Sequence, residues 1–164
     1  MPGLSVYRHP AATEKFTMQK LLPPHLFLIA LVSMIALHVA QPEPRWAGDT
    51  QLLAGLAFAA VFLALAFIGA AQFRRHRTNI HTFRKPDTLV TSGLFRWTRN
   101  PMYLGFAGAL AGAAIAMNCV SGLVITLLYV LIADRWYIRF EERTMAETFG
   151  PAYAEYRAKT RRWI

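Results

Sequence analysis

The residues best suited to chemistry lie in two short segments on either side of a long apolar stretch. Residues 92–105 read SGLFRWTRNPMYLG and hold two arginines, an Asn-Pro pair and a tyrosine. The second segment is the acidic pair Glu141 and Glu142. Guanidinium groups donate to carboxylates, carboxylates accept from ammonium and hydroxyl groups, and an aromatic ring can face a cation. Together these side chains predict a cleft for a polar ligand that carries charges of both signs.

S-adenosylmethionine is such a ligand, because it has a sulfonium, an ammonium, a carboxylate, a ribose diol and an adenine. The side chains that could bind it are Arg96, Arg99, Asn100, Tyr103, Glu141 and Glu142. Each has a plainer alternative: interfacial arginines that reach lipid phosphates, an Asn-Pro helix start with Asn100 as its cap, an aromatic-belt tyrosine, and a solvated acidic turn. The combination of these side chains at one face favours the cofactor hypothesis. No residue stands out as a catalytic group, and the chain lacks a nucleophile with a nearby base.

The elements that would position these residues are apolar helices. Of the 164 residues, 55% are hydrophobic, and the apolar ones form four blocks, at 26–40, 52–73, 102–117 and 121–133. About 20 apolar residues span a hydrocarbon layer of about 30 Å. We therefore expect an all-α, polytopic membrane protein with about four transmembrane helices, followed by a C-terminal amphipathic helical segment that breaks at Gly150-Pro151.

The four blocks fit one membrane domain over residues 1–164. Residues 1–75 would form an N-terminal two-helix hairpin, and residues 76–164 a catalytic loop, a second hairpin and a tail. Pro101 suits the first turn of the third helix. A hairpin that starts there returns near residues 136–140 on the same membrane face, so we expect Glu141 and Glu142 to lie close to Asn100.

The small residues of the third helix indicate a close contact. Gly108 and Gly112 form a GxxxG pair, which favours helix packing. Gly105 lies on the same stripe, and either a neighbouring helix or a cofactor could approach it. These glycines do not form the G-x-G-x-x-G pattern of a dinucleotide fold. In the loop before this helix, we expect Leu89 and Val90 to anchor residues 76–100 on the membrane surface.

The net charge of +9 is unevenly distributed. Residues 74–100 hold seven basic residues against one acidic residue, and the two ends of the chain are also basic. This pattern predicts an inner-membrane protein with both termini in the cytoplasm. Membrane lipids explain the basic clusters, so we expect no nucleic-acid partner. The five histidines show no metal-ligand spacing, and we expect no metal; the single Cys119 excludes an internal disulfide.

Several motifs together resemble one known family. They are residues 89–96 (LVTSGLFR), 99–105 (RNPMYLG), 141–143 (EER), 149–153 (FGPAY) and 161–164 (RRWI). In this order, with a hairpin between them, they resemble the bacterial isoprenylcysteine carboxyl methyltransferase-like family, which is related to the phospholipid methyltransferases. The resemblance covers residues 78–164. Asn100 stands where many members have histidine, and Leu94-Phe95 where Pro-Tyr is common.

The resemblance implies an integral membrane enzyme that uses S-adenosylmethionine on the cytoplasmic side of the bacterial inner membrane. The residues it implies as cofactor contacts are Arg99, Asn100, Pro101, Tyr103, Gly105, Glu141 and Glu142. The acceptor would be lipophilic: an isoprenylcysteine-like carboxylate, a thiol or a lipid. Two alternatives stay open, because fold alone does not fix chemistry. They are an NADPH-dependent membrane reductase of the same fold and a non-catalytic membrane partner protein.

Overall fold

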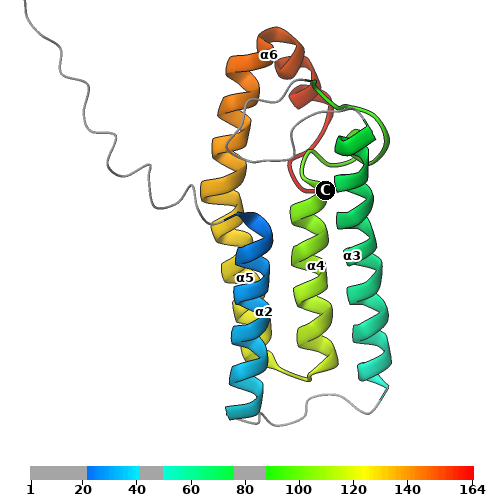
Figure 1. The fold of residues 1–164 in the computed structure, drawn as a ribbon, viewed down its shortest axis with the longest axis vertical. Helices are drawn as coiled ribbons and strands as arrows, with labels where there is room; N and C mark the ends of the chain where they lie inside the picture. The colour runs from blue at the N-terminus through cyan, green and yellow to red at the C-terminus, as the bar shows by residue number, and fades with distance from the viewer. Residues whose placement is uncertain (1–21, 41–49, 76–87) are drawn as a thin grey trace, which may run out of the picture.

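The computed structural model describes residues 22–40, 50–75 and 88–164, and its regular elements in these ranges are all helical (Figure 1). They are α2 (Pro23–Ala40), α3 (Gln51–Arg75), the short 3₁₀ helix η1 (Gly93–Arg96), α4 (Pro101–Ala116), α5 (Val120–Ile132), the π-helical turn η2 (Ala133–Ile138) and α6 (Arg139–Lys159). The all-α prediction is confirmed. The surface loop expected at 76–100 falls outside the described residues over 76–87.

Each of the four apolar blocks forms a helix. α2, α3 and the continuous helical stretch Val120–Lys159 are long and apolar enough to cross a membrane, and α4 is a shorter apolar helix of 16 residues. The 25 residues of α3 give a length of about 37 Å, which exceeds a hydrocarbon layer of about 30 Å. The chain is therefore a polytopic membrane protein by the length and composition of its helices.

The closest contact in the bundle joins α3 and α4. A Cβ atom added at Gly112 would lie 2.6 Å from the backbone nitrogen of Ala59 and 2.7 Å from the carbonyl oxygen of Gly55. A Cβ at Gly108 would lie 2.1 Å from the ring of Phe62. Only glycine allows this approach, so the packing role expected of Gly108 and Gly112 is confirmed.

The second hairpin forms the centre of the bundle. α4 lies between α2 and α3, and α2 packs against α5 and α4 (Figure 1). Met34, Leu110 and Tyr129 are among the fully buried side chains of the cluster that fills the space between these helices. The two helices of the N-terminal segment thus pack mainly on the second hairpin, whereas the grouping of the whole chain into one domain stays a prediction.

The last long helix runs without interruption from α5 through η2 into α6. It breaks at Gly150, where φ is 49°, a conformation that favours glycine, and Pro151 follows. The break predicted at Gly150-Pro151 is confirmed. Beyond it the chain turns back over the end of the bundle, and the C-terminus returns beside the start of α4 (Figure 1).

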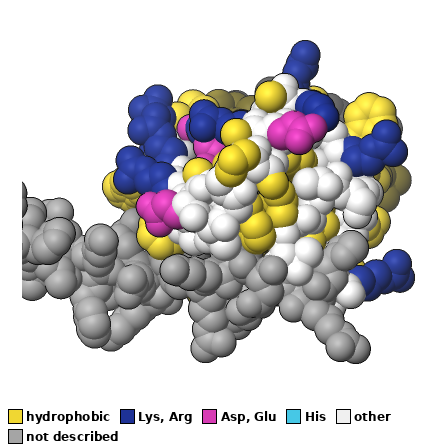
Figure 2. Space-filling view, turned by 90° about the horizontal axis from the view of Figure 1, so that it is seen from above, with side chains coloured by type: hydrophobic (Ala, Val, Ile, Leu, Met, Phe, Trp, Pro, Cys, Tyr) yellow, Lys and Arg dark blue, Asp and Glu magenta, His cyan; other side chains and the backbone are white. Residues whose placement is uncertain are grey.

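Charged side chains gather at this same end. Within residues 22–40, 50–75 and 88–164, all lysines, arginines, aspartates and glutamates belong to the end of α3, to residues 96–99 or to the segment after α5. Seen from above, basic side chains stand around the rim of this end (Figure 2). The α4–α5 turn at the opposite end has none. The polar chemistry of the described chain is therefore confined to one end of the bundle.

Candidate functional site

The α4–α5 hairpin brings the two polar motifs into direct contact. Arg99 Nη2 donates to Glu142 Oε1 at 2.8 Å, and the side chains of these residues are only 9% and 11% exposed. Pro101 occupies the first turn of α4, which fixes Arg99 just before the helix begins. The expected return of the acidic pair to the Arg-Asn-Pro corner is confirmed.

Most of the hydrogen-bonding capacity of Arg99 is used within the protein. Its Nη1 atom donates to the carbonyl oxygen of Arg157 at 3.3 Å and to that of Thr160, both near the end of α6. Its Nε atom is buried and has no hydrogen-bond partner among the described residues. A buried donor without a partner is costly, so this N–H group is available to a ligand.

Glu142 is held by a second guanidinium group. Arg162 Nη2 lies 2.5 Å from Glu142 Oε2, and Arg162 Nε donates to Glu142 Oε1 at 3.2 Å. Burial alone would raise the pKa of Glu142, but hydrogen bonds from Arg162 and Arg99 and the charges of both groups outweigh it. The pKa of Glu142 therefore lies below its usual value, and the carboxylate stays ionised.

Glu141 takes a different partner. Tyr103, which lies in the first turn of α4 and is 4% exposed, donates its hydroxyl to Glu141 Oε1 at 3.0 Å. The ring of Tyr103 is tilted against that of Tyr137, with 6.4 Å between ring centroids. Glu141 thus contacts α4 through Tyr103, whereas Glu142 contacts Arg99, the residue before the Asn-Pro start of α4.

Asn100 stands at the helix start but does not cap it. Its side chain makes no cap hydrogen bond to α4; instead its Nδ2 atom donates to the carbonyl oxygen of Arg162 at 2.9 Å. Its backbone N–H donates to Thr98 Oγ1 at 3.1 Å. Asn100 therefore links the start of α4 to the C-terminal residues, a role different from the helix cap weighed for it.

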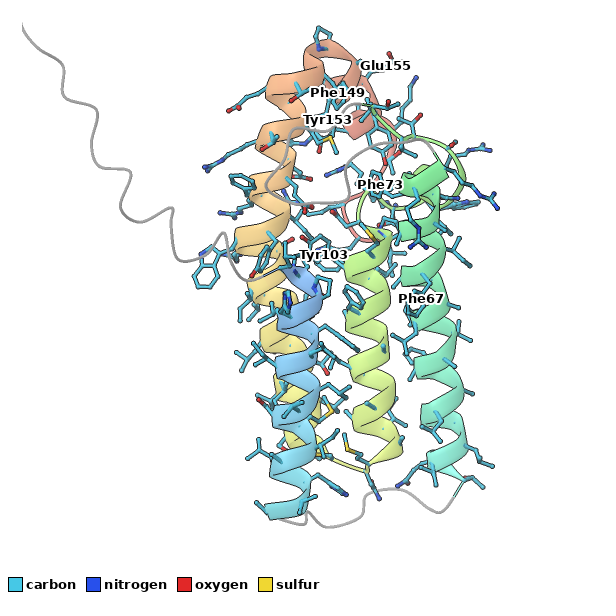
Figure 3. The ribbon with its side chains drawn as sticks, in the orientation of Figure 1. Phe67, Phe73, Tyr103, Phe149, Tyr153 and Glu155 are labelled. Carbon is cyan, nitrogen blue, oxygen red and sulfur yellow. The ribbon has the colours of Figure 1, made fainter. Side chains whose placement is uncertain are left out.

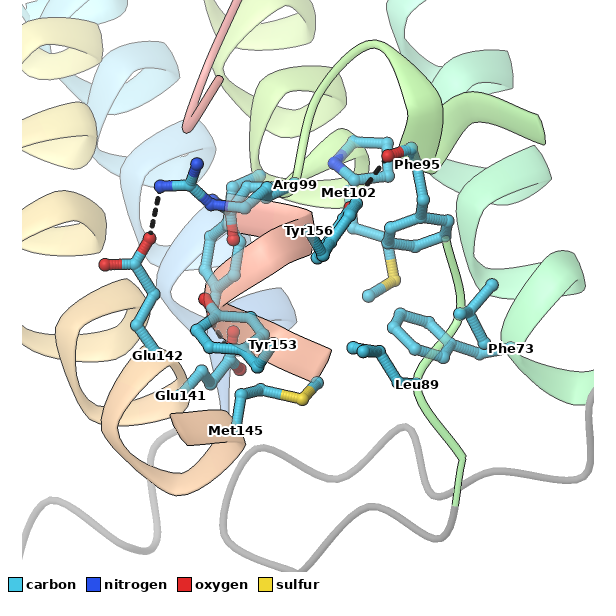
Figure 4. Close-up of a pocket in the computed structure, with 14 residues that line it drawn as sticks. Phe73, Leu89, Phe95, Arg99, Met102, Glu141, Glu142, Met145, Tyr153 and Tyr156 are labelled. Atoms are coloured by element: carbon cyan, nitrogen blue, oxygen red, sulfur yellow. Dashed lines mark hydrogen bonds and ion pairs between the residues drawn. The ribbon is translucent and has the colours of Figure 1, made fainter. Parts of the chain in front are cut away.

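A pocket lies between these motifs (Figure 4). Its lining residues are Phe73, Leu89, Val90, Phe95, Arg99, Asn100, Pro101, Met102, Tyr103, Glu141, Glu142, Met145, Tyr153 and Tyr156. Arg99, Glu141 and Glu142 lie on one side, and Phe73 and Leu89 on the other (Figure 4). The volume of this pocket is about 60 Å³, well below the roughly 300–1,000 Å³ of typical small-molecule pockets. A nucleoside-sized ligand would therefore require lining side chains to move.

The pocket lies at the charged end of the bundle. Phe73 and Tyr153 both lie toward the end of the bundle that carries α6, whereas Phe67 lies further from that end on α3 (Figure 3). A ligand bound here could meet both the water-facing end and the apolar helices.

Other residues singled out in the sequence lie elsewhere. A Cβ atom at Gly105 would lie 2.6 Å from Ala66 Cβ, so helix packing accounts for this glycine, and a cofactor contact stays a prediction. Arg96 is exposed and does not line the pocket. Val90 is 5% exposed, and both it and Leu89 line the pocket wall. The expectation that Val90 anchors the loop in the membrane is therefore wrong, whereas for the half-buried Leu89 it stays a prediction.

Sequence reasoning gave no role to several residues of the site. Tyr156 donates its hydroxyl to the carbonyl oxygen of Phe95 at 2.7 Å and so ties the end of α6 to η1. Burial raises the pKa of Tyr156, which keeps the hydroxyl protonated. Arg162 and Asp134 were missed as well, although an aspartate at the end of an apolar span is a signal of function.

Comparisons with known proteins find sequences similar to part of this chain. Residues 50–152 match the phospholipid methyltransferase family. The chain is 37% identical over 83 residues to the protein-S-isoprenylcysteine O-methyltransferase of Saccharomyces cerevisiae, which covers 49% of this chain and 34% of the relative. For the protein of the same name in Schizosaccharomyces pombe, the identity is 35% over 79 residues, 46% of this chain and 32% of the relative.

A bacterial protein is similar over a comparable length. The cobalt-zinc-cadmium resistance protein CzcN of Cupriavidus metallidurans is 38% identical over 82 residues, which covers 47% of this chain and 35% of the relative. The chain spans about a third of the length of these curated relatives. No solved structure matches the chain.

Proposed function

The chain belongs to the phospholipid methyltransferase family, and on this premise we propose that it transfers the methyl group of S-adenosylmethionine to a lipophilic acceptor. The observation that carries the proposal is the contact between Arg99 and Glu142, which joins the two polar motifs in one pocket. That pocket has a charged side for the donor and an apolar side for the acceptor. The relatives named as methyltransferases support the same reaction class.

The side chains of the pocket suit the donor group by group. The unpartnered Nε–H of Arg99 can donate to the donor's carboxylate. Glu141 and Glu142 can accept from its ammonium or from the ribose hydroxyls. The ring of Tyr153, which lines the pocket, offers a face for the adenine or for the sulfonium. Pro101 and Asn100 hold the backbone that carries Arg99.

The main contribution of this chain to the reaction would be to position the methyl donor and the acceptor. S-adenosylmethionine, when bound, supplies an electrophilic methyl group on a positively charged sulfur. The charged side of the pocket would orient that group, while Phe73, Leu89 and Met102 would hold the apolar part of the acceptor and exclude water. An anionic acceptor such as a carboxylate or thiolate needs no general base, and we assign no catalytic residue.

We place the pocket on the cytoplasmic side of the bacterial inner membrane, with both termini in the cytoplasm. The clustering of arginines and lysines at the pocket end of the bundle supports this orientation. A cysteine introduced at Trp97, whose side chain is 80% exposed at this end, would be labelled only from the cytoplasmic side. Labelling from the outside would contradict the orientation.

Isothermal titration of the purified protein in detergent tests the donor. We expect S-adenosylhomocysteine to bind with micromolar affinity and NADPH not to bind. Glu142→Gln should weaken the binding of S-adenosylhomocysteine about tenfold or more, because it removes a negative charge from the buried side of the pocket that would hold the methyl donor. Glu147→Gln is the matched control, since Glu147 is an exposed glutamate on the same helix; it should bind like the unmodified chain.

Three outcomes would contradict parts of the proposal. Binding of NADPH without S-adenosylhomocysteine would favour the reductase alternative. Binding of neither would favour a non-catalytic membrane protein. Unchanged binding by Glu142→Gln would remove the assignment of this glutamate while leaving the donor in place.

The acceptor is proposed as a class: an isoprenylcysteine-like carboxylate, a thiol or a membrane lipid. Two of the relatives are named for isoprenylcysteine, and the apolar half of the pocket fits a lipid-like group. Incubation with a radiolabelled methyl donor, first with membrane lipid extracts and then with a prenylated cysteine, would identify the methylated product. Absence of label in every lipophilic acceptor would contradict the class.

A further inference from the structure

One polar cluster remains outside the pocket lining, at the junction of η2 and the C-terminal residues. Asp134 lies in η2, where the apolar part of the last long helix ends, and its side chain is 21% exposed. Trp163 Nε1 donates to Asp134 Oδ1 at 3.0 Å, and Arg162 Nη1 lies 3.2 Å from the same oxygen. A carboxylate at the end of an apolar helix is costly unless it is paired. Arg162 and Trp163 therefore stabilise Asp134 in this position.

Arg162 connects this aspartate to the pocket. Its Nη1 atom bonds Asp134, while its Nε and Nη2 atoms bond Glu142. The planar guanidinium group therefore bridges two carboxylates that lie two helical turns apart on one continuous helix. Arg99 completes the set on the other side of Glu142, and Arg135 Nε lies 3.9 Å from the second oxygen of Asp134.

The backbone of the C-terminal residues is fixed independently of these ion pairs. The carbonyl oxygen of Arg161 accepts from the backbone N–H of Arg99 at 3.0 Å. The carbonyl oxygen of Arg162 accepts from Asn100 Nδ2 at 2.9 Å and from Thr98 Oγ1 at 3.3 Å. Arg162 is thus presented to Glu142 from a segment that is hydrogen-bonded to the start of α4.

We propose that Arg162, held by Asp134, is a positioning residue that aims the carboxylate of Glu142 at the methyl donor. The proposal rests on the proposed function, in which Glu142 contacts that donor. Without Arg162, Glu142 would keep only its bond to Arg99 and could turn away from the pocket. Asp134 acts one step further back, because it fixes the guanidinium group that fixes Glu142.

The pH dependence of donor binding separates positioning from simple stabilisation. The charged or titratable groups around Glu142 are Arg99 before α4, Arg162 in the tail, Tyr153 in the second half of α6 and the neighbouring Glu141. Hydrogen bonds from Arg162 and Arg99 hold the pKa of Glu142 below its usual value against the effect of burial. Loss of Arg162 should raise that pKa and move the acid limb of donor binding to higher pH.

The test measures the affinity for S-adenosylhomocysteine between about pH 3 and pH 8 in the unmodified protein and its variants. Arg162→Ala should weaken binding about tenfold or more and shift the acid limb upward. Arg162→Lys keeps the charge but not the fork and should restore little of the affinity. Arg161→Ala removes the neighbouring, exposed arginine side chain and should bind like the unmodified chain.

The outcomes separate this inference from the proposed function. Failure of the unmodified protein to bind S-adenosylhomocysteine would contradict the proposed function itself. Normal binding by that protein, with an unchanged affinity or an unmoved acid limb in Arg162→Ala, would overturn the role of Arg162. If Arg162→Ala does not fold, Asp134→Asn keeps Arg162 on Glu142 and removes the charge behind it. The Asp134→Asn variant should bind S-adenosylhomocysteine about threefold more weakly than the unmodified protein. Equal affinities of the two proteins would overturn the inference.

Discussion

Helix α4 is held in two different ways, along its length by α3 and at its start by α6 and the C-terminal residues. The contact with α3 depends on glycines such as Gly112 that let two backbones approach. The contact at the start of α4 depends on hydrogen bonds and ion pairs, and Arg99–Glu142 is the most buried of the ion pairs among the described residues. The first contact is close-packed, whereas the second keeps an unpartnered donor on Arg99.

This difference assigns different tasks to the two regions. A close-packed apolar contact has no space for a ligand. A substitution there should therefore lower the stability and leave the binding of the methyl donor almost unchanged. At the polar junction, the N–H group of Arg99 Nε has no partner among the described residues and lies beside a pocket, so it can bind a ligand. A substitution there should therefore alter ligand binding more than folding. Measuring both the stability and the methyl-donor binding of each variant therefore tests whether the two regions differ in this way.

The largest effect should come from the contact between α3 and α4. Gly112→Leu would place a side chain where a Cβ atom is already 2.6 Å from the backbone of Ala59. Because backbone cannot move aside as a side chain can, we expect a loss of at least about 3 kcal/mol of stability. Thermal unfolding in detergent measures it. Ala57→Leu introduces the same side chain on an exposed face of α3 and should change little; equal losses in both variants would contradict the packing argument.

The second effect concerns the ionisation of Glu142. Its pKa lies below the usual value of 4.5, so its ionised form stabilises the folded protein above that pH. This contribution to stability should disappear as the pH falls through the lower folded pKa. Unfolding measured from pH 7 down to pH 3 should show a steeper decline in the unmodified chain than in Glu142→Gln. Glu147→Gln should keep the unmodified slope.

A smaller effect should follow removal of one hydroxyl at the junction. Tyr103→Phe deletes the hydrogen bond to Glu141 and leaves the buried ring in place. We expect donor binding to weaken about fivefold, which corresponds to about 1 kcal/mol. The thermal midpoint should move little. A large fall in stability without a change in binding would place Tyr103 with the packing region instead.

The smallest effect should have the opposite sign. Tyr129 lies in α5, is 1% exposed, and its hydroxyl has no hydrogen-bond partner within the described part of the chain. Tyr129→Phe removes a buried group that has lost its water, so stability should rise by about 0.5–1 kcal/mol. Donor binding should stay the same. A loss of stability would show that this hydroxyl has a partner.

Much of the fold could be predicted because it depends on repeated, non-directional features. Four apolar blocks predict four helices, Pro101 predicts a helix start, and Gly108 with Gly112 predicts a close contact. The break at Gly150 follows from its neighbour proline and its own freedom at positive φ. Each of these signals is local in the sequence and needs no knowledge of the partner.

The site could be predicted only at the level of which motifs meet. Hairpin geometry brings residues 141–142 back to residue 99, but it does not say which atom bonds which. Arg162 lies 20 residues from Glu142 in sequence, and no spacing rule links them. Asn100 could be a helix cap from its place before Pro101, yet its Nδ2 atom donates to the carbonyl oxygen of Arg162 and its side chain makes no cap hydrogen bond.

The π-helical turn η2 sets the rotational phase of everything that follows it. Each residue of an α-helix advances the chain by about 100° around the axis, and a π turn accommodates one extra residue per turn. If Ala133–Ile138 formed an ordinary α-helix with no residue removed, Glu141 and Glu142 would therefore be rotated by about a quarter of a circle. The membrane-embedded part of the helix would be untouched, yet the acidic pair would point away from α4.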